Sequence, residues 1–160
     1  MKSKLRSRTS WREKMERPQG PKVVDIPPNM SRFGAGMMLI PTPKLVDELI
    51  RRVPKGRLTT VSELRRKLAA DFKADVTCPL TTGIFVRMAA EAAEEDRSNG
   101  RKRITPYWRV VKDDGSFNPK LPGGVAQQSR QLKAEGFDVV AIGKRPPRLI
   151  DFEGRLIRFK

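Results

Sequence analysis

The sequence contains no histidine, a single cysteine (Cys78) and a single tyrosine (Tyr107). Without histidine, the chain lacks the commonest general base and the commonest metal-binding side chain of proteins. One cysteine alone can form neither an internal disulfide nor a Cys/His zinc site. We therefore expect no metal ion and no cofactor.

Acidic residues are also scarce. The 160 residues include 34 Lys and Arg but only 18 Asp and Glu, which gives a formal net charge of +16. Such an excess indicates a polyanionic partner, because cationic side chains release the counterions that are condensed on phosphates. Nucleic acid is the expected partner, with solubility alone as the alternative. The chain shows no long basic amphipathic helix and no apolar span, so no membrane partner is expected.

The length fits one domain with extensions. Residues 1–28 are rich in Lys, Arg and Pro and predict a basic, flexible arm with a short helix around residues 11–15. Residues 29–140 are expected to form the domain. Residues 141–160 are expected to form a basic extension, with a β-hairpin from Arg148 to Phe159 that turns at Glu153 and Gly154. The N-terminus lacks the apolar segment of a signal peptide, so a cytoplasmic, nucleoid-associated monomer is expected.

Local signals predict four helices in the domain. They are expected at about residues 43–52, 61–72, 81–95 and 125–135. Thr42 with Pro43 and a Thr60–Glu63 capping box mark two starts, and Gly136 marks the last end. The second and third helices, joined by a short link, have the pattern of a helix-turn-helix, although paired amphipathic helices are common. The predicted fold is mainly α with a small β element, a winged helix-turn-helix domain.

The third predicted helix has chemically different ends. Four acidic residues close it (Glu91, Glu94, Glu95 and Asp96), so its N-terminus is the end expected to face DNA. At that end Thr81 and Thr82 offer hydroxyl groups, Gly83 permits close approach, and the helix dipole favours an anion.

The stretch from Pro106 to Val111 follows a basic loop that contains Arg101, Lys102 and Arg103. Its β-branched and aromatic residues predict a strand, and Pro106 confines the start of that strand to an edge. Two interpretations are open for Tyr107 and Trp108: they line a functional pocket, or they fill the core as aromatic residues usually do.

Taken in order, several motifs resemble the DNA-binding domain of the alkylguanine-DNA alkyltransferase (methylated-DNA–protein-cysteine methyltransferase) family. They are Val53-Pro54-Lys55-Gly56, Thr59-Thr60-Val61, Pro106-Tyr107-Trp108-Arg109-Val110-Val111, Asp114-Gly115, Gly123-Gly124 and Leu132-Lys133-Ala134-Glu135-Gly136. The match covers about residues 44–137. The reactive cysteine of the family motif is Tyr107 here and the activating histidine is Trp108, so alkyl transfer is not expected. A phenol is a poor acceptor at neutral pH, and Trp108 cannot relay a proton.

In these departures the chain is similar to the alkyltransferase-like proteins, which bind damaged DNA without repairing it. The resemblance implies a duplex partner bound in the minor groove, a flipped O6-alkylguanine, and a repair protein that recognises the complex. The implied lesion pocket comprises Pro106, Tyr107, Trp108, Arg109, Gly123, Gly124 and Glu135. The DNA-binding residues predicted from charge, helix ends and the resemblance are Thr60, Thr81, Thr82, Gly83, Arg87, Arg101, Lys102 and Arg103.

Two departures bear on base flipping. Val61 replaces the tyrosine that helps to rotate the nucleotide, and the arginine that fills the vacated stack matches either Arg87 or Gly83. The main hypothesis is therefore a non-catalytic DNA-binding protein that senses modified guanine for DNA repair. The alternatives are a general DNA- or RNA-binding winged-helix protein without lesion specificity and, at lower weight, a diverged alkyltransferase that uses Cys78.

Overall fold

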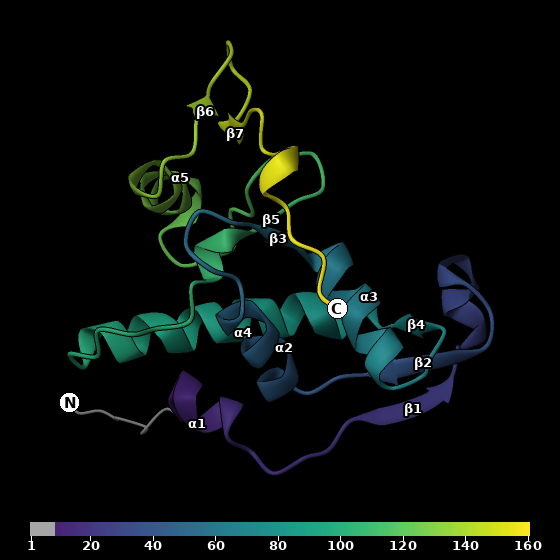
Figure 1. The fold of residues 1–160 in the computed structure, drawn as a ribbon. Coiled ribbons are helices and arrows are strands. Elements are labelled where there is room, and N and C mark those ends of the chain that lie inside the picture. Colours follow the sequence, from purple (N-terminus) through teal and green to yellow (C-terminus); the bar gives the residue numbers. More distant parts are fainter. Residues whose placement is uncertain (1–8) are drawn as a thin grey trace.

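The structure, a computed structural model, describes residues 9–160 (Figure 1). The helices in this part are α1 (Trp11–Met15), α2 (Pro43–Arg51), α3 (Val61–Asp71), α4 (Pro79–Ser98) and α5 (Gly124–Ala134), with 3₁₀ turns at Pro28–Phe33, Tyr107–Arg109 and Glu153–Arg155. The strands are β1 (Lys22–Asp25), β2 (Met37–Ile40), β3 (Thr59–Thr60), β4 (Val76–Thr77), β5 (Val110–Val111), β6 (Val139–Val140) and β7 (Arg148–Leu149). They form three small sheets with the orders β1-β2-β4, β3-β5 and β6-β7, in which β2-β4 and β3-β5 are parallel pairs.

The 20-residue helix α4 is the element around which the others pack (Figure 1). Four of its alanines (Ala89, Ala90, Ala92 and Ala93) are fully buried. Because alanine is small and is the strongest helix former, this stretch favours helix and lets neighbouring elements approach on two sides. Helices α1, α2 and α3 and the Tyr107–Arg109 turn all contact α4.

The predicted helix starts of α2 and α3 are confirmed. The Thr42 hydroxyl accepts the Leu45 N–H at 3.3 Å, and the Thr60 hydroxyl accepts the Glu63 N–H at 3.1 Å. The second half of the predicted capping box is absent from α3. The Glu63 carboxylate instead accepts bonds from Arg66 and from the backbone N–H of Phe159, at 2.6 Å for the latter. Glu63 therefore fixes the C-terminal segment of the chain instead of its own helix end.

Helix α4 differs in length from the prediction. It starts at Pro79, two residues before Thr81, because a proline at the first helical position loses no hydrogen bond. It ends at Ser98, three residues beyond the predicted end at Glu95. Ile84, on the first half of α4, is 59% exposed although it is apolar.

The N-terminal arm is packed on the domain, which corrects the flexible arm predicted for residues 9–28; residues 1–8 lie outside the described residues. The predicted short helix is present as α1. The Glu95 carboxylate accepts the backbone N–H groups of Trp11 and Arg12 at 2.8 and 2.9 Å, and Met15 is 1% exposed. Strand β1 then pairs with β2. Two acidic residues of α4 explain the docking, since Asp96 also pairs with the Arg12 guanidinium at 2.7 Å.

Two other predicted elements are wrong in detail. Tyr107–Arg109 forms a 3₁₀ turn, and only Val110–Val111 is a strand. The C-terminal hairpin is formed by β6 and β7, so its turn lies at residues 141–147 and not at Glu153. After the hairpin the chain returns to the domain, where the Ile157 N–H donates to the Leu58 carbonyl at 2.9 Å.

One large core includes residues from both ends of the described chain, from Met15 to Phe159. A second, small cluster contains Met30, Met38 and Cys78. The division of the chain at residues 28 and 140 and the winged form of the helix-turn-helix stay predictions. In the part that the structure describes, no helix has the length and apolar character that crossing a bilayer requires.

Candidate nucleic-acid interface

Tyr107 and Trp108 lie inside the protein. Tyr107 is fully buried, and its hydroxyl donates to the Glu94 carboxylate on α4 at 2.6 Å. The two aromatic rings meet edge to face with centroids 5.4 Å apart. Burial, followed by the hydrogen bond to Glu94, raises the pKa of Tyr107 above the ordinary range of a phenol. Tyr107 is therefore a neutral hydrogen-bond donor with no access to solvent.

Glu135, the residue that follows α5, collects the other polar groups of this motif. Its carboxylate accepts the Trp108 indole N–H at 2.8 Å and pairs with the Arg109 guanidinium at 2.7 Å. Arg109 also donates to the Val53 carbonyl at 2.7 Å. Burial alone would raise the pKa of Glu135, but the hydrogen bonds from Arg109 and Trp108 and the charge of Arg109 hold it below its usual value. The motif is thus locked by a charged, largely buried network.

The two glycines of the predicted pocket begin α5. Gly123 and Gly124 both have positive φ values, +77° and +66°, which only glycine adopts readily. Further along α5, the Gln128 amide donates to the carbonyls of Trp108 and Val110 at 3.1 and 2.8 Å. Helix α5 therefore holds the aromatic motif from the side that faces away from α4.

A small apolar hollow of about 90 Å³ lies beside the motif, between the start of α3, helix α4 and strand β5. Its lining residues are Val61, Val86, Val110, Val111, Lys112, Asn118 and Leu121. We refer to it as the valine hollow. Neither Tyr107 nor any other residue of the predicted lesion pocket lines this hollow. The sequence offered one signal for it, Val61 in place of the family tyrosine.

The first half of α4 presents an exposed apolar stripe. Leu80 is 60% exposed and Ile84 is 59% exposed, and one turn further Arg87 is half exposed and 3.6 Å from Glu91. A Cβ added to Gly83 would meet no atom within 4 Å, so this residue also faces open space. Positions 80, 84 and 87 follow helical spacing and share one face.

Two of the predicted DNA-binding residues, Thr82 and Thr60, are buried. Thr82 is fully buried, and its hydroxyl donates to the Cys78 carbonyl at 2.7 Å. Thr60 is 6% exposed and its hydroxyl is used in capping α3. Thr81 stays on the N-terminal turn of α4, where its hydroxyl oxygen is covered and has no partner within the described residues. The buried side of the helix thus takes the hydroxyls, and the exposed side carries apolar groups.

The basic residues Arg101, Lys102 and Arg103 lie at the opposite end of α4 from Leu80. Twenty residues of α-helix span about 30 Å. The predicted DNA-binding residues therefore do not form one patch: Gly83 and Arg87 belong to the first half of α4, and residues 101–103 lie beyond its C-terminus. Three of the acidic residues between them, Glu94, Glu95 and Asp96, are occupied internally, by Tyr107, the start of α1 and Arg12, whereas Glu91 lies 3.6 Å from Arg87.

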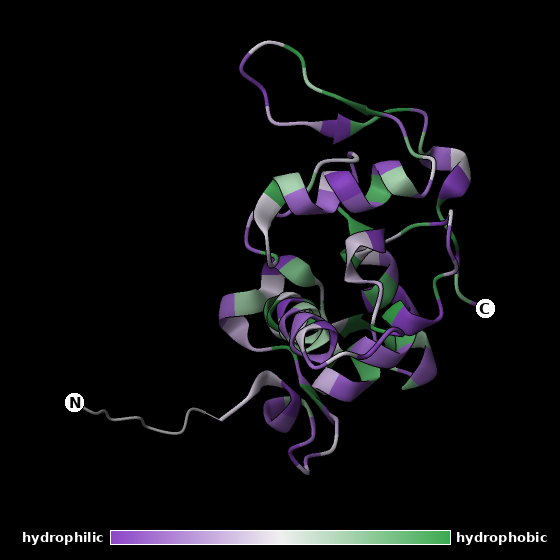
Figure 2. Ribbon diagram, turned by 90° about the vertical axis from the view of Figure 1, so that its left-hand side faces the viewer, coloured by the Kyte–Doolittle hydropathy of each residue, from purple (hydrophilic) through white to green (hydrophobic). Residues whose placement is uncertain are grey.

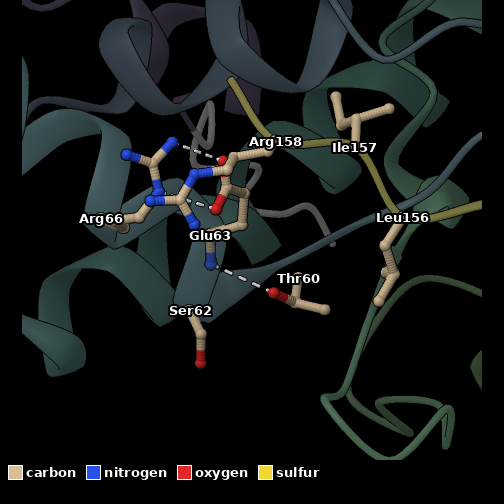
Figure 3. Close-up of a pocket in the computed structure, with 7 residues that line it drawn as sticks. All are labelled: Thr60, Ser62, Glu63, Arg66, Leu156, Ile157 and Arg158. Atoms are coloured by element: carbon tan, nitrogen blue, oxygen red, sulfur yellow. Dashed lines mark hydrogen bonds and ion pairs between the residues drawn. The ribbon is translucent and has the colours of Figure 1, made fainter. Parts of the chain in front are cut away.

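Figure 3 shows another hollow, of about 370 Å³, where the C-terminal segment crosses α3. Glu63 and Arg66 form an ion pair at 2.8 Å in its wall, and Arg66 also binds the Phe159 carbonyl. These contacts attach the end of the chain to α3. Within residues 9–160, no group of three or more Cys, Asp or Glu side chains is placed to hold a metal ion.

The fold is that of the alkyltransferase-like proteins. The structure superimposes on S. pombe Atl1 in complex with damaged DNA containing O6-carboxymethylguanine, with a TM-score of 0.50 and 14% sequence identity over 72% of this chain and 94% of that chain. A second solved structure, S. pombe ATL in complex with DNA, gives a TM-score of 0.51 at the same identity and coverage. No family model and no curated protein sequence matches the chain. At this identity the likeness shows a shared fold.

Proposed function

We propose that this chain binds duplex DNA through the exposed face of the first half of α4, and that it senses modified guanine without catalysis. The observation that carries the proposal is the stripe of Leu80, Ile84 and Arg87. It lies in a fold that the chain shares with S. pombe Atl1, a protein solved in complex with damaged DNA. The net charge of +16 supplies the attraction for phosphates.

The chemistry of the stripe fits the minor groove. Proteins that bind there insert apolar side chains between base steps and neutralise the flanking phosphates with basic residues. Leu80 and Ile84 are exposed apolar groups one turn apart, and Arg87 follows after three residues. They extend from the N-terminal end of α4, where unpaired N–H groups and the helix dipole favour phosphate.

The valine hollow, of about 90 Å³, is smaller than a purine, so it is the proposed receptor for the alkyl group of an altered guanine and not for the whole base. Val86, next to Arg87, lines it from α4, and Asn118 adds an amide that can pair with a polar base edge. Unstacking a base costs a few kcal/mol and costs least where pairing is already weakened. A modified guanine would therefore be selected by its lower cost of extrusion.

Two observations support binding without alkyl transfer. The Tyr107 phenol is buried and hydrogen bonded, and its pKa is raised, so it supplies no nucleophile. Cys78 is 5% exposed and packs against Met30 and Met38. A protein that holds a lesion without removing it needs a partner to complete the repair, so we propose a repair protein as a second partner.

Leu80→Ala combined with Ile84→Ala tests the interface. We expect the affinity for a duplex, measured by fluorescence anisotropy at fixed salt, to fall by tenfold or more, because each buried aliphatic side chain contributes about 1.5–3 kcal/mol. Ile142→Ala is the matched control, since Ile142 is 68% exposed on the β6-β7 hairpin. Unchanged affinity in the double variant would refute the interface.

Lesion sensing is tested with paired duplexes, one of which carries a single O6-methylguanine. We expect a preference of about tenfold, equivalent to 1.4 kcal/mol. Val61→Phe narrows the valine hollow from its rim and is expected to abolish the preference while binding to unmodified DNA persists. Val23→Phe, at an exposed position of β1, is the control. Equal affinity of the wild-type chain for both duplexes would leave the alternative, a general basic DNA- or RNA-binding protein.

A further inference from the structure

A third hollow, of about 370 Å³, opens at the C-terminal end of α4. Five cationic side chains line it: Arg51, Arg97, Lys102, Arg103 and Arg109. No acidic residue lines it. We call it the basic hollow. It takes in the basic loop that the sequence assigned to DNA binding, but it lies away from the stripe on α4.

The charges of the basic hollow are only partly balanced. Three of its arginines pair with acids outside the lining: Arg51 with Asp47 at 2.9 Å, Arg97 with Glu94 at 3.0 Å, and Arg109 with Glu135 at 2.7 Å. Lys102 and Arg103 are exposed, and neither forms a salt bridge with any residue in the range 9–160. The hollow therefore keeps a positive charge that suits an anionic ligand.

The loop that carries these cations is attached at both ends. Gly100, with a φ of +87°, turns the chain after α4, and the Arg101 N–H donates to the Asp96 carbonyl at 2.9 Å. At the other end the Thr105 hydroxyl donates to the buried Asp47 carboxylate at 2.6 Å. A loop that is already ordered loses less entropy when a ligand binds. Lys102 and Arg103 are thus held in place between two fixed points.

The basic hollow and the proposed DNA-binding stripe lie toward opposite ends of α4. Figure 2 looks along α4 from its C-terminal end, so the N-terminal half of the helix lies at the far side. Along α4, Leu80 and Arg97 are about 26 Å apart, and Arg87 and Arg97 are about 15 Å apart. The hollow therefore lies beyond the end of the stripe that the proposed duplex would occupy.

We propose that the basic hollow binds the phosphodiester backbone of a second nucleic-acid segment, so that one molecule bridges two duplexes. The bridging rests on the proposed function for its first duplex. Guanidinium groups match phosphate oxygens in geometry and charge. Trp108 lines the hollow but is only 8% exposed, so it offers no face for base stacking. This second contact is therefore independent of the nucleotide sequence.

A two-duplex capture assay tests the proposal. One duplex is immobilised on beads and the protein is added, followed by a fluorescent duplex at fixed salt. We expect the wild-type chain to retain the second duplex. Lys102→Gln combined with Arg103→Gln is expected to lower retention by more than tenfold, because two phosphate contacts are lost. Affinity for a single duplex, measured by anisotropy, is expected to stay within about twofold.

Arg130→Gln combined with Lys133→Gln is the control, since it removes the same charges from exposed positions of α5. Equal loss in this control, or full retention in the Lys102/Arg103 variant, overturns the proposal; the latter result also indicates bridging by a dimer. If the Lys102/Arg103 variant binds polyglutamate more weakly than wild type but captures the second duplex normally, the hollow takes an acidic polypeptide. If single-duplex binding depends on Lys102 and Arg103 and not on Leu80 and Ile84, the proposed function itself fails.

Discussion

At the scale of single residues, Tyr107 and Trp108 show what a side-chain network does to a local preference. Their aromatic and β-branched surroundings predict a strand, yet the segment turns as a 3₁₀ helix. Two carboxylates account for the difference, because Glu94 binds the Tyr107 hydroxyl and Glu135 binds the Trp108 indole. Neither acid is close in sequence to the motif, so strand propensity alone could not reveal the turn. The structure supports the second of the two interpretations that the sequence left open for these aromatics, because Tyr107 and Trp108 both lie in the core.

The Tyr107 network predicts an unusual titration. The chain has one tyrosine, so its near-ultraviolet phenolate absorbance reports this residue alone. Burial and the Glu94 hydrogen bond raise its pKa in the folded state, whereas the unfolded chain should ionise near pH 10. We expect no phenolate signal from the folded protein at that pH and about half of the full signal once urea has unfolded it.

The same shift fixes the sign of a stability change. A group whose pKa is raised by folding stabilises the protein below its unfolded pKa, and this contribution is lost as the pH rises toward the folded value. The free energy of unfolding should therefore decline above about pH 10. Tyr107→Phe removes the ionisable group and should show a smaller decline. A phenolate that appears near pH 10 in the folded protein would contradict the buried position.

At the scale of elements, helices with local signals were predictable and docked elements were not. Caps at Thr42 and Thr60 and the stop at Gly136 gave α2, α3 and α5 within a residue or two, because each signal lies within a few residues of the end it marks. The packing of α1 depends on Glu95 and Asp96, more than eighty residues away. The C-terminal hairpin was misplaced for a similar reason, since Ile157 and Phe159, the last residues of the predicted hairpin, bond to Leu58 and Glu63.

Met15 tests whether α1 belongs to the folded domain. It is 1% exposed on an element that the sequence predicts as part of a flexible arm. Met15→Ala should lower the free energy of unfolding by about 2–5 kcal/mol, as large-to-small changes in a core do. Met37→Ala, at a position that is 37% exposed on β2, should cost far less. Urea denaturation of both variants measures the difference, and equal small effects would mean that α1 does not hold its place in solution.

At the scale of the whole molecule, the valine hollow, the stripe on α4 and the basic hollow share one support. Helix α4 contributes Val86 to the first, Leu80 and Ile84 to the second, and Arg97 to the third. The excess of positive charge alone predicted a nucleic-acid partner. It did not predict that the two surfaces proposed to bind nucleic acid lie toward opposite ends of α4. The position of these surfaces depends on which acidic side chains of α4 are bound internally, and the contacts Arg12–Asp96 and Tyr107–Glu94 form only in the folded chain.

One core that runs from Met15 to Phe159 predicts a single cooperative unfolding transition. The two tryptophans report different elements of it, Trp11 on α1 and Trp108 in the buried motif. In urea, tryptophan fluorescence and far-ultraviolet circular dichroism should give coincident curves, because α1 and the C-terminal segment both pack into the large core. Trp11→Phe leaves Trp108 as the only fluorescent indole, and its curve should keep the same midpoint once corrected for any change in stability. A transition at lower urea seen only when Trp11 is present would show that α1 detaches before the domain unfolds, so the N-terminal segment would then act as a separable arm.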